Sequence, residues 1–226
     1  MPPTVARPAG DRLRAPYYSA TVYTPRHFGV GDDDTASFLP TIEVADLVTV
    51  TESGLVATFL PLIFDAGHGS LLGHVARKND QWKLPAIGEA LVIAHGEDAY
   101  VSPGWYASKA EHGRVVPTWD YTTAHVYGEL RVHDDAAWVE DLVRRLTLRH
   151  ETGRSAPWSV DDAPEKFREG QFRAIVGIEL AIGRVEAKFK LSQNRSQADI
   201  DGVVEGLVGD GLPQVAAAVE RARPAP

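Results

Sequence analysis

Short apolar or alternating runs follow one another through the first half of the chain, a pattern typical of β-strands. Turns that contain glycine separate them: Glu52-Ser53-Gly54 suits a tight hairpin, and residues 65–69 form the next turn. The predicted strands cover residues 46–51, 55–64, 70–77, 89–95 and 100–102, a long alternating stretch within 115–133, and one or two strands in 174–191.

Helical patterns come mainly in the second half of the chain. Asp134 and Asp135 are predicted to cap a helix whose apolar stripe, formed by Trp138, Leu142 and Leu146, has helical spacing. Other helices are predicted at 37–42, at 79–82, from 161–164 onward, and at 200–208, where Ser196 and Asp199 resemble a capping box.

The order of these elements indicates the fold class. Six or more strands stand mostly before the helices, without the alternation of strand and helix that builds a parallel sheet. We therefore predict a mainly β protein with appended helices (α+β), built on an antiparallel barrel. Residues 1–21, rich in Pro, Ala and Arg, are predicted to be a flexible leader. The barrel domain with its C-terminal helices is expected at 22–210, and a last helix and tail at 211–226.

Composition narrows the possible functions. The 226 residues are 44% hydrophobic and 24% charged, which is ordinary for one globular domain. The net charge of −8 opposes binding to nucleic acid. No cysteine is present, so a metal or haem would need one of the eight histidines, a carboxylate, Tyr or Lys. No apolar run is long enough to span a membrane, and we expect a cytoplasmic protein. Phosphate-loop, dinucleotide-binding, nucleophile-elbow and zinc-protease motifs are absent from the sequence.

The segment Tyr100–Gly128 is the densest in candidate chemistry. It holds two of the five Trp and four of the seven Tyr, the composition of a pocket wall for a planar ligand. The polar residues Ser102, Lys109, His112, Arg114 and Thr118 are interleaved with these aromatics and could bind a phosphate or carboxylate. A loop packed over the barrel mouth, or a dimer interface, would have the same composition.

Strand parity separates the histidines. His74 shares its face with Leu72 and Ala76, so it is predicted to be at least half buried and to need a carbonyl, a carboxylate or a metal as partner. His125 and His133 lie on the polar face of their strand and are predicted to be solvated or at an interface. The run Arg77-Lys78-Asn79, directly after the strand of His74, suits a grip on phosphate or propionate and equally a solvated strand end.

Four segments carry a resemblance to a known family: residues 22–28 (VYTPRHF), 73–77 (GHVAR), 100–128 and 190–195 (KLSQNR). From about Tyr23 to Leu207 the chain resembles the PaiB family of FMN-binding negative transcriptional regulators. The resemblance implies a split β-barrel of the FMN-binding, pyridoxamine-phosphate-oxidase-like type. It also implies a homodimer with cofactor sites at the subunit interface.

The family also contains a haem-dependent branch, the piperazate synthases. These cyclases of antibiotic biosynthesis close the N–N bond of L-piperazic acid from N5-hydroxy-L-ornithine with loss of water. Two departures from the family pattern bear on the choice. Phe59 stands where the family has His in Ala-Thr-His-Leu-Pro, and Lys78 and Asp80 replace Ala and Pro of Ala-Arg-Ala-Asn-Pro. The loss of that histidine, with the acidic charge, favours a haem-dependent lyase acting on a small molecule.

The resemblance assigns expected roles to individual residues. For haem b, the expected cofactor-binding residues are His74 as the iron ligand, the cations Arg77 and Lys78, the hydroxyls of Thr58 and Ser102, and an aromatic wall of Trp105, Tyr106 and Trp119. The expected catalytic base is one of Lys109, Glu111 and His112.

Two alternatives to the haem enzyme remain. A flavin-dependent oxidoreductase would hold the FMN phosphate through Arg77, Lys78, Ser102 or Lys109. A PaiB-type regulator would have to bind DNA or a partner directly. No helix-turn-helix pattern stands out, and nucleic acid is therefore not an expected partner.

Overall fold

The computed structural model describes residues 22–225, and its centre is a closed antiparallel barrel of six strands. The strands are β1 (Val44–Thr51), β2 (Gly54–Asp65), β3 (Ser70–Ala76), β4 (Ala90–Val101), β5 (Thr118–His133) and β6 (Ile175–Lys190), in the order β1-β2-β3-β6-β5-β4 around the barrel. The prediction of a mainly β protein with appended helices is confirmed. The predicted leader, residues 1–21, lies outside the described residues.

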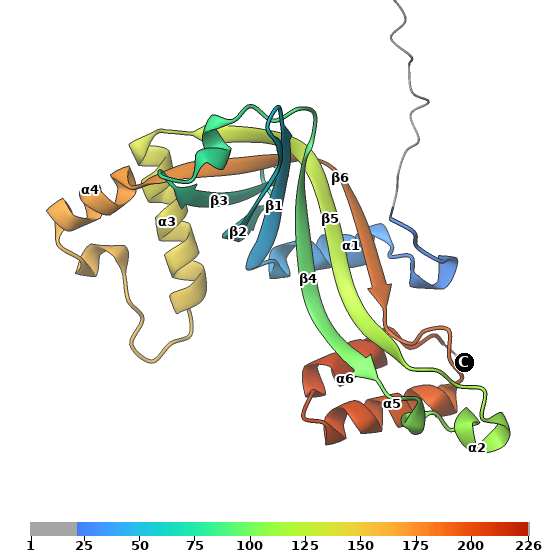
Figure 1. The fold of residues 1–226 in the computed structure, drawn as a ribbon. Helices are drawn as coiled ribbons and strands as arrows, with labels where there is room; N and C mark the ends of the chain where they lie inside the picture. The colour runs from blue at the N-terminus through green and yellow to red at the C-terminus, as the bar shows by residue number, and fades with distance from the viewer. Residues whose placement is uncertain (1–21, 226) are drawn as a thin grey trace, which may run out of the picture.

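The helices form two groups, one on the side of the barrel and one beyond its end (Figure 1). The α-helices are α1 (Asp32–Phe38), α2 (Ser108–His112), α3 (Ala136–Glu151), α4 (Glu165–Arg173), α5 (Gln197–Gly209) and α6 (Pro213–Arg221). The 3-10 helices are η1 (Arg26–Phe28), η2 (Leu39–Thr41), η3 (Asp80–Lys83), η4 (Pro103–Trp105) and η5 (Val160–Asp162). Within residues 22–225 no helix has the length and apolarity needed to cross a membrane.

Alternation along β3 shows how the barrel is built. Leu71 and Val75 point into the barrel core, whereas Leu72 points outward and packs under α3. Gly54 and Gly69 have positive φ values of 109° and 60° at the two hairpin turns, a backbone conformation that glycine adopts without strain. The predicted turns at these positions are therefore confirmed.

Helix α3 covers one side of the barrel. Its Leu142 and Leu146 pack against Ile63 of β2 and Leu72 of β3, with Trp138 beside them. The carboxylate of Asp135 accepts a hydrogen bond from the Trp138 backbone N–H at 2.8 Å and so caps the helix. The apolar stripe predicted for this helix is confirmed.

The second group, which we call the helical lobe, comprises α2, α5 and α6 at the far ends of β4 and β5 (Figure 1). Its core contains Val203 and Leu207 of α5 and Val215 and Val219 of α6. The predicted tail, 211–226, thus contributes to the same core as residues before 210.

The predicted capping box of α5 forms only in half. The Ser196 hydroxyl accepts a hydrogen bond from the Asp199 backbone N–H at 3.2 Å. The Asp199 carboxylate does not return to Ser196, because it accepts from the backbone N–H and hydroxyl of Ser108 at 2.9 and 3.0 Å. This carboxylate therefore ties α2 to α5.

Candidate functional site

The outer faces of β2, β1, β4 and β5, here called the uncovered wall, carry an unusual share of exposed apolar side chains. Leu55 and Phe59 on β2 are 75% and 65% exposed. Val44, Val50, Tyr100 and Trp119 are also exposed on the neighbouring strands. Leu55 pairs directly with Val50, and a contiguous exposed apolar surface can mark a binding face.

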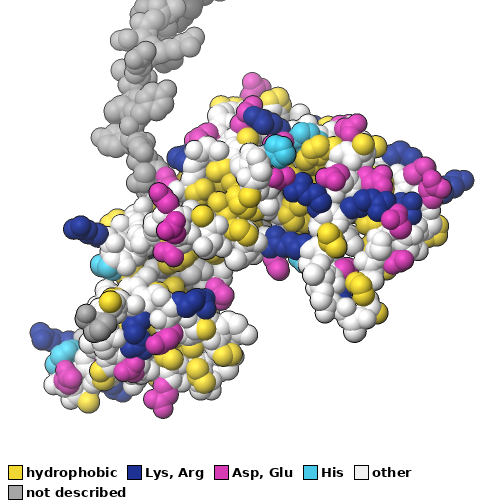
Figure 2. All heavy atoms as spheres, turned by 180° about the vertical axis from the view of Figure 1, so that it is seen from behind, with side chains coloured by type: hydrophobic (Ala, Val, Ile, Leu, Met, Phe, Trp, Pro, Cys, Tyr) yellow, Lys and Arg dark blue, Asp and Glu magenta, His cyan; other side chains and the backbone are white. Residues whose placement is uncertain are grey.

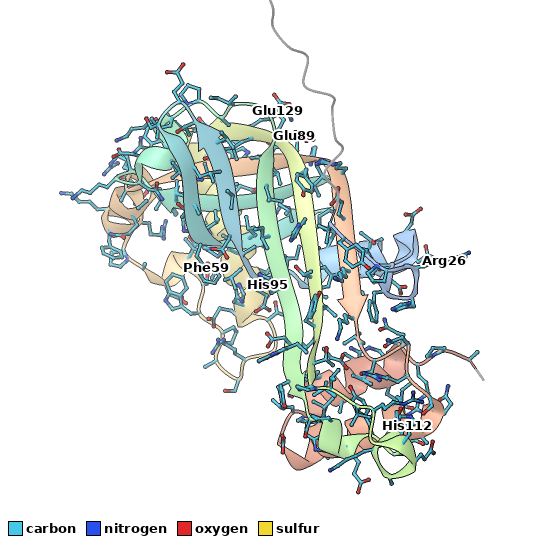
Figure 3. All side chains as sticks on the ribbon, turned by 45° about the vertical axis from the view of Figure 1, so that its right-hand side comes forward. Arg26, Phe59, Glu89, His95, His112 and Glu129 are labelled. Atoms are coloured by element: carbon cyan, nitrogen blue, oxygen red, sulfur yellow. The ribbon has the colours of Figure 1, made fainter. Side chains whose placement is uncertain are left out.

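Strand register places the side chains of the uncovered wall in rows. Phe59 pairs with Asp46, Asp46 with Ile93, and Ile93 with His125, so these four residues face the same side across four strands. His95 pairs with Thr123 in the adjacent row. Phe59 and His95 lie on the same side of the barrel (Figure 3).

A cavity of about 400 Å³ lies on the β4 and β5 part of this wall. It is lined by His95, Asp98, Trp119, Tyr121, Thr122, Thr123 and His125. The strand pairing shifts register between His95 and Asp98, and this β-bulge re-aims the side chains at the cavity edge. The signal for it in the sequence is Gly96 within a strand pattern.

His125, one of the two histidines that line this cavity, has a lowered pKa. Burial lowers its pKa, the nearby His95 lowers it further, and Glu186 on β6 opposes both effects. His125 is therefore neutral at neutral pH. It is half-buried, so full solvation, the first of its two expected surroundings, is wrong, and a place at an interface stays a prediction. His125 pairs with Ile93, one row from His95, and this register is not specified by the sequence.

His74 on β3 is half-buried, as predicted. Its Nδ1 is buried and has no hydrogen-bond partner among residues 22–225. Burial lowers its pKa, so the imidazole is neutral. It sits opposite Gly177 of β6, whose missing side chain leaves space that Trp138 fills.

The strand end after His74 is largely engaged in internal contacts. Arg77 forms a bidentate pair with Asp134, at 2.5 and 3.0 Å, and its Nε donates to the carbonyl of Arg173 at 2.6 Å. The Thr58 hydroxyl accepts from the Asn79 side-chain amide at 2.9 Å. Lys78 is exposed and has no ion pair within the described residues. Of the predicted grip, Lys78 is the cation left free for an anion.

Three residues of the expected aromatic and polar pocket belong instead to the helical lobe. Ser102 caps η4 by accepting from the Gly104 backbone N–H at 3.1 Å. Trp105 packs on α5, where a Cβ at Gly206 would come within 2.2 Å of its ring. Tyr106 is buried, and burial raises its pKa. Trp119 alone of these aromatics lies on the uncovered wall.

The expected catalytic bases Lys109, Glu111 and His112 are exposed on α2. His112 lies on the helical lobe, far from Phe59 and His95 (Figure 3). The structure thus separates these three residues from His74. Strands β4 and β5 run beyond the barrel, and α2 lies in the segment that joins their far ends. Of the expected cofactor-binding residues, the structure brings Thr58 to the strand end at Arg77-Lys78-Asn79, where the Asn79 side-chain amide donates to the Thr58 hydroxyl. His74 lies on the outer face of β3 with Leu72, away from that contact.

The comparisons with solved structures define the class of protein. The flavocytochrome Anf3 from Azotobacter vinelandii matches with a TM-score of 0.54 at 13% identity, over 74% of this chain and 72% of that one. The FAD and heme binding protein from Mycobacterium smegmatis matches with a TM-score of 0.52 at 19% identity, over 76% and 77%. At such identities the likeness shows the fold alone, a split β-barrel of the FMN-binding type.

The sequence comparisons identify the family. Residues 22–184 match the family model described as "Putative FMN-binding domain". The chain is 31% identical over 196 residues to protease synthase and sporulation protein PAI 2 of Bacillus subtilis (strain 168), covering 85% of this chain and 92% of that protein. It is 33% identical over 186 residues to the uncharacterized protein AN0679 of Emericella nidulans, covering 67% and 74%. The chain belongs to this PaiB-like FMN-binding family, which confirms the resemblance.

Proposed function

We propose that this protein is a flavin-dependent oxidoreductase that holds FMN on the uncovered wall, closed in by a second copy of the chain. The observation that carries the proposal is the exposed apolar surface of β2 and β1 next to the strand end that carries Lys78. The side-chain amide of Asn79, the residue after Lys78, donates to Thr58, the residue before Phe59. Membership of an FMN-binding family supports it. The names of two proteins with the same fold, a flavocytochrome and an FAD and heme binding protein, include a flavin and also a haem.

The donor set fits the chemistry of FMN. Its isoalloxazine ring is planar and largely apolar, and Phe59 and Leu55 offer apolar contact area of this kind. Its phosphate needs a cation, and Lys78 directly follows the strand end beside Phe59. Arg77 supports this arrangement from behind, because its pair with Asp134 fixes the strand end from which Lys78 projects.

A second copy would complete the site. One wall exposes FMN to water, whereas a partner wall packed against it would exclude solvent. Stable dimers bury about 1,200–2,000 Å² in total, and apolar strand faces suit such an interface. The homodimer implied by the family resemblance would then use Leu55, Phe59 and Val50 at its centre.

FMN, when bound, would supply the hydride acceptor for oxidation of a small molecule. The residues of the chain itself would bind FMN and orient the substrate. Lys78 would hold the phosphate, and the wall residues would exclude water from the ring. Neutral His125, with its lowered pKa, can accept a proton from a substrate hydroxyl or amine at neutral pH.

One observation favours a second candidate, the haem-dependent cyclase that forms the N–N bond of piperazic acid. His74 is neutral, and neutral imidazole is the form that ligates iron. Haem b would supply a Lewis acid for the hydroxylamine oxygen of the substrate. Iron-ligating histidines ordinarily donate their second ring N–H to an oxygen, and the Nδ1 of His74 has no such partner among the described residues. This contact would have to form when haem binds.

A binding experiment separates these candidates. We expect saturable binding of FMN, measured by the quenching of its fluorescence when it is titrated with the protein. Lys78→Gln should weaken FMN at least tenfold, since a charged contact to phosphate contributes about 1.5–3 kcal/mol. The same substitution should leave riboflavin, which lacks the phosphate, unaffected. Lys166→Gln on α4 is the matched control, because Lys166 is also an exposed cation.

Two results would overturn the flavin proposal. One is the absence of saturable binding by both FMN and riboflavin. The other is saturable binding of hemin, seen as a shift of its Soret band from the position in free hemin, that His74→Gln abolishes, together with no flavin binding. That second result would establish the haem candidate.

A further inference from the structure

A second cavity, of about 960 Å³, lies between the barrel and the helical lobe. Five parts of the chain meet there: residues 27–41, the β-bulge at 95–97, Thr122 of β5, the end of β6 at 189–193, and residues 218–224. Its volume is in the usual range for sites that bind small molecules. It is separate from the β2 surface on which the flavin proposal rests, and His95 and Thr122 border it and the smaller cavity alike.

The barrel side of this cavity is firmly built. The rings of Phe38 on α1 and Phe189 on β6 pack with centroids 5.5 Å apart. Gly29 forms an isolated β-bridge with Lys188. A Cβ at Gly96 would come within 2.1 Å of the Thr122 hydroxyl oxygen and 3.1 Å of Phe38, so only glycine lets the bulge lie this close. The cavity is therefore preformed.

Charged side chains of both signs line the cavity without pairing. Asp34 comes from α1, Glu97 from the bulge and Arg221 from the end of α6. None of the three has an ion pair or a side-chain hydrogen bond within residues 22–225. Figure 2 shows charged side chains of both signs on either side of the junction between barrel and lobe.

The lack of ion pairs among Asp34, Glu97 and Arg221 has a chemical consequence. Two carboxylates and a guanidinium that share a cavity but stay beyond 4 Å cannot neutralise one another directly. A ligand that carries an ammonium and a carboxylate group could reach both kinds of charge. The hydroxyl of Thr122, buried and without a partner among the described residues, adds an unused polar group beside the cavity.

We propose that this cavity binds a small zwitterion of the amino-acid class. Its ammonium group would contact Asp34 and Glu97, and its carboxylate would contact Arg221. Its hydrocarbon part would lie on the aromatic pair of Phe38 and Phe189. Such a site would be a second one, separate from the β2 surface on which the flavin proposal rests.

Three matched probes test the charges of the ligand. L-Norleucine carries both groups, hexanoate lacks the ammonium group, and n-pentylamine lacks the carboxylate. In a ¹H–¹⁵N NMR titration of the full chain, norleucine should shift the amide signals of Gly29 and Gly96 with saturation. Hexanoate and pentylamine should bind at least tenfold more weakly.

Two substitutions then test the residues. Arg221→Gln should weaken norleucine and hexanoate at least tenfold and leave pentylamine unchanged. Glu97→Gln should weaken norleucine and pentylamine and leave hexanoate unchanged. Glu52→Gln, at an exposed turn outside the cavity, is the control and should change nothing. All three residues are exposed, so folding should be preserved, and circular dichroism checks this.

The outcome is decisive either way. The opposite selectivity of the two variants would establish a zwitterion site between barrel and lobe. Saturation by none of the probes, equal binding of hexanoate and norleucine, or shifts away from residues 27–41, 95–97 and 218–224 would overturn it.

Discussion

The indole ring of Trp138 lies almost parallel to the imidazole of His133, with centroids 4.1 Å apart and an interplanar angle of 5°. The indole fills the space above Gly177, where a Cβ would come within 2.1 Å of it. Gly177 pairs with His74 on one side and with His133 on the other. Helix α3 is thus seated in a notch between two histidines, and its position sets the burial of His74.

Gly177→Ala should displace Trp138 and lower the free energy of unfolding by about 1–3 kcal/mol, the usual cost of overpacking. Gly170→Ala, on exposed helix α4, is the control, since a Cβ there would meet nothing within 4 Å. The control should be neutral or slightly stabilising. Urea denaturation measures the free energy of unfolding of both variants. Equal changes in the two would contradict the close packing of Trp138 on Gly177.

The stability of the protein should fall as the pH drops below about 6.5, the ordinary pKa of histidine. Burial lowers the pKa of His74 in the folded state, so the unfolded chain binds a proton more readily. The contribution of His74 is complete above this pH and is lost as the pH falls toward the lowered pKa. Urea unfolding at pH 8 and 5.5 should show a smaller difference in His74→Gln, although His125 retains part of it.

A spectroscopic measurement checks the assignment to His74. An NMR titration of the His74 ring gives the sign of its pKa shift directly. A pKa above about 6.5, the ordinary value for histidine, would contradict the expected effect of burial.

Ser192 should contribute to stability despite an unfavourable backbone. Its φ is 61°, and its hydroxyl donates to buried Asp120 at 2.7 Å. Losing a hydrogen bond to a charged group costs about 1.5–3 kcal/mol, more than the 1–2 kcal/mol of left-handed strain that glycine removes. Ser192→Gly should therefore be destabilising, and Ser192→Ala more so because it keeps the strain. Urea denaturation tests this ranking, which a wild-type stability of Ser192→Gly would refute.

The helical lobe should depend on the contact between Trp105 and Gly206. Gly206→Ala places a Cβ within 2.2 Å of the Trp105 ring and should cost about 1–3 kcal/mol of unfolding free energy. Gly209→Ala on the same helix meets nothing within 4 Å and serves as the control. Thermal unfolding that is unchanged in Gly206→Ala would show that the indole moves at little cost.

Phe59→Asp should dissociate the proposed homodimer, because a charge at the centre of an apolar interface is left without a partner. Leu148→Asp is the control, since Leu148 is a comparably exposed apolar residue on α3, away from the uncovered wall. Light scattering after gel filtration gives the mass of each variant. A monomeric wild type, or a dimer that survives Phe59→Asp, would contradict the interface.

The sequence by itself determined the local structure and the fold class. Period-two alternation depends on neighbouring residues only, so it placed most strand ends within a few residues of those observed. It was wrong to divide β4 (Ala90–Val101) into strands at 89–95 and 100–102, because the bulge after His95 interrupts the alternation within a continuous strand. It also put His74 on the half-buried face of β3. The stripe of α3 and its Asp135 cap were equally local. Family motifs supplied the split barrel, which no single pattern could.

The tertiary structure decided which side chains meet. The sequence favoured Lys109 and His112 beside the cofactor, but β4 and β5 run past the barrel and carry α2 onto the helical lobe. Arg77 was a candidate grip until the fold brought Asp134 within 2.5 Å of it. Strand register, which joins residues far apart in the chain, placed His125 opposite Ile93, one row from the bulge at His95, and seated Trp138 over Gly177. Such contacts depend on the closure of the barrel, and no local pattern encodes them.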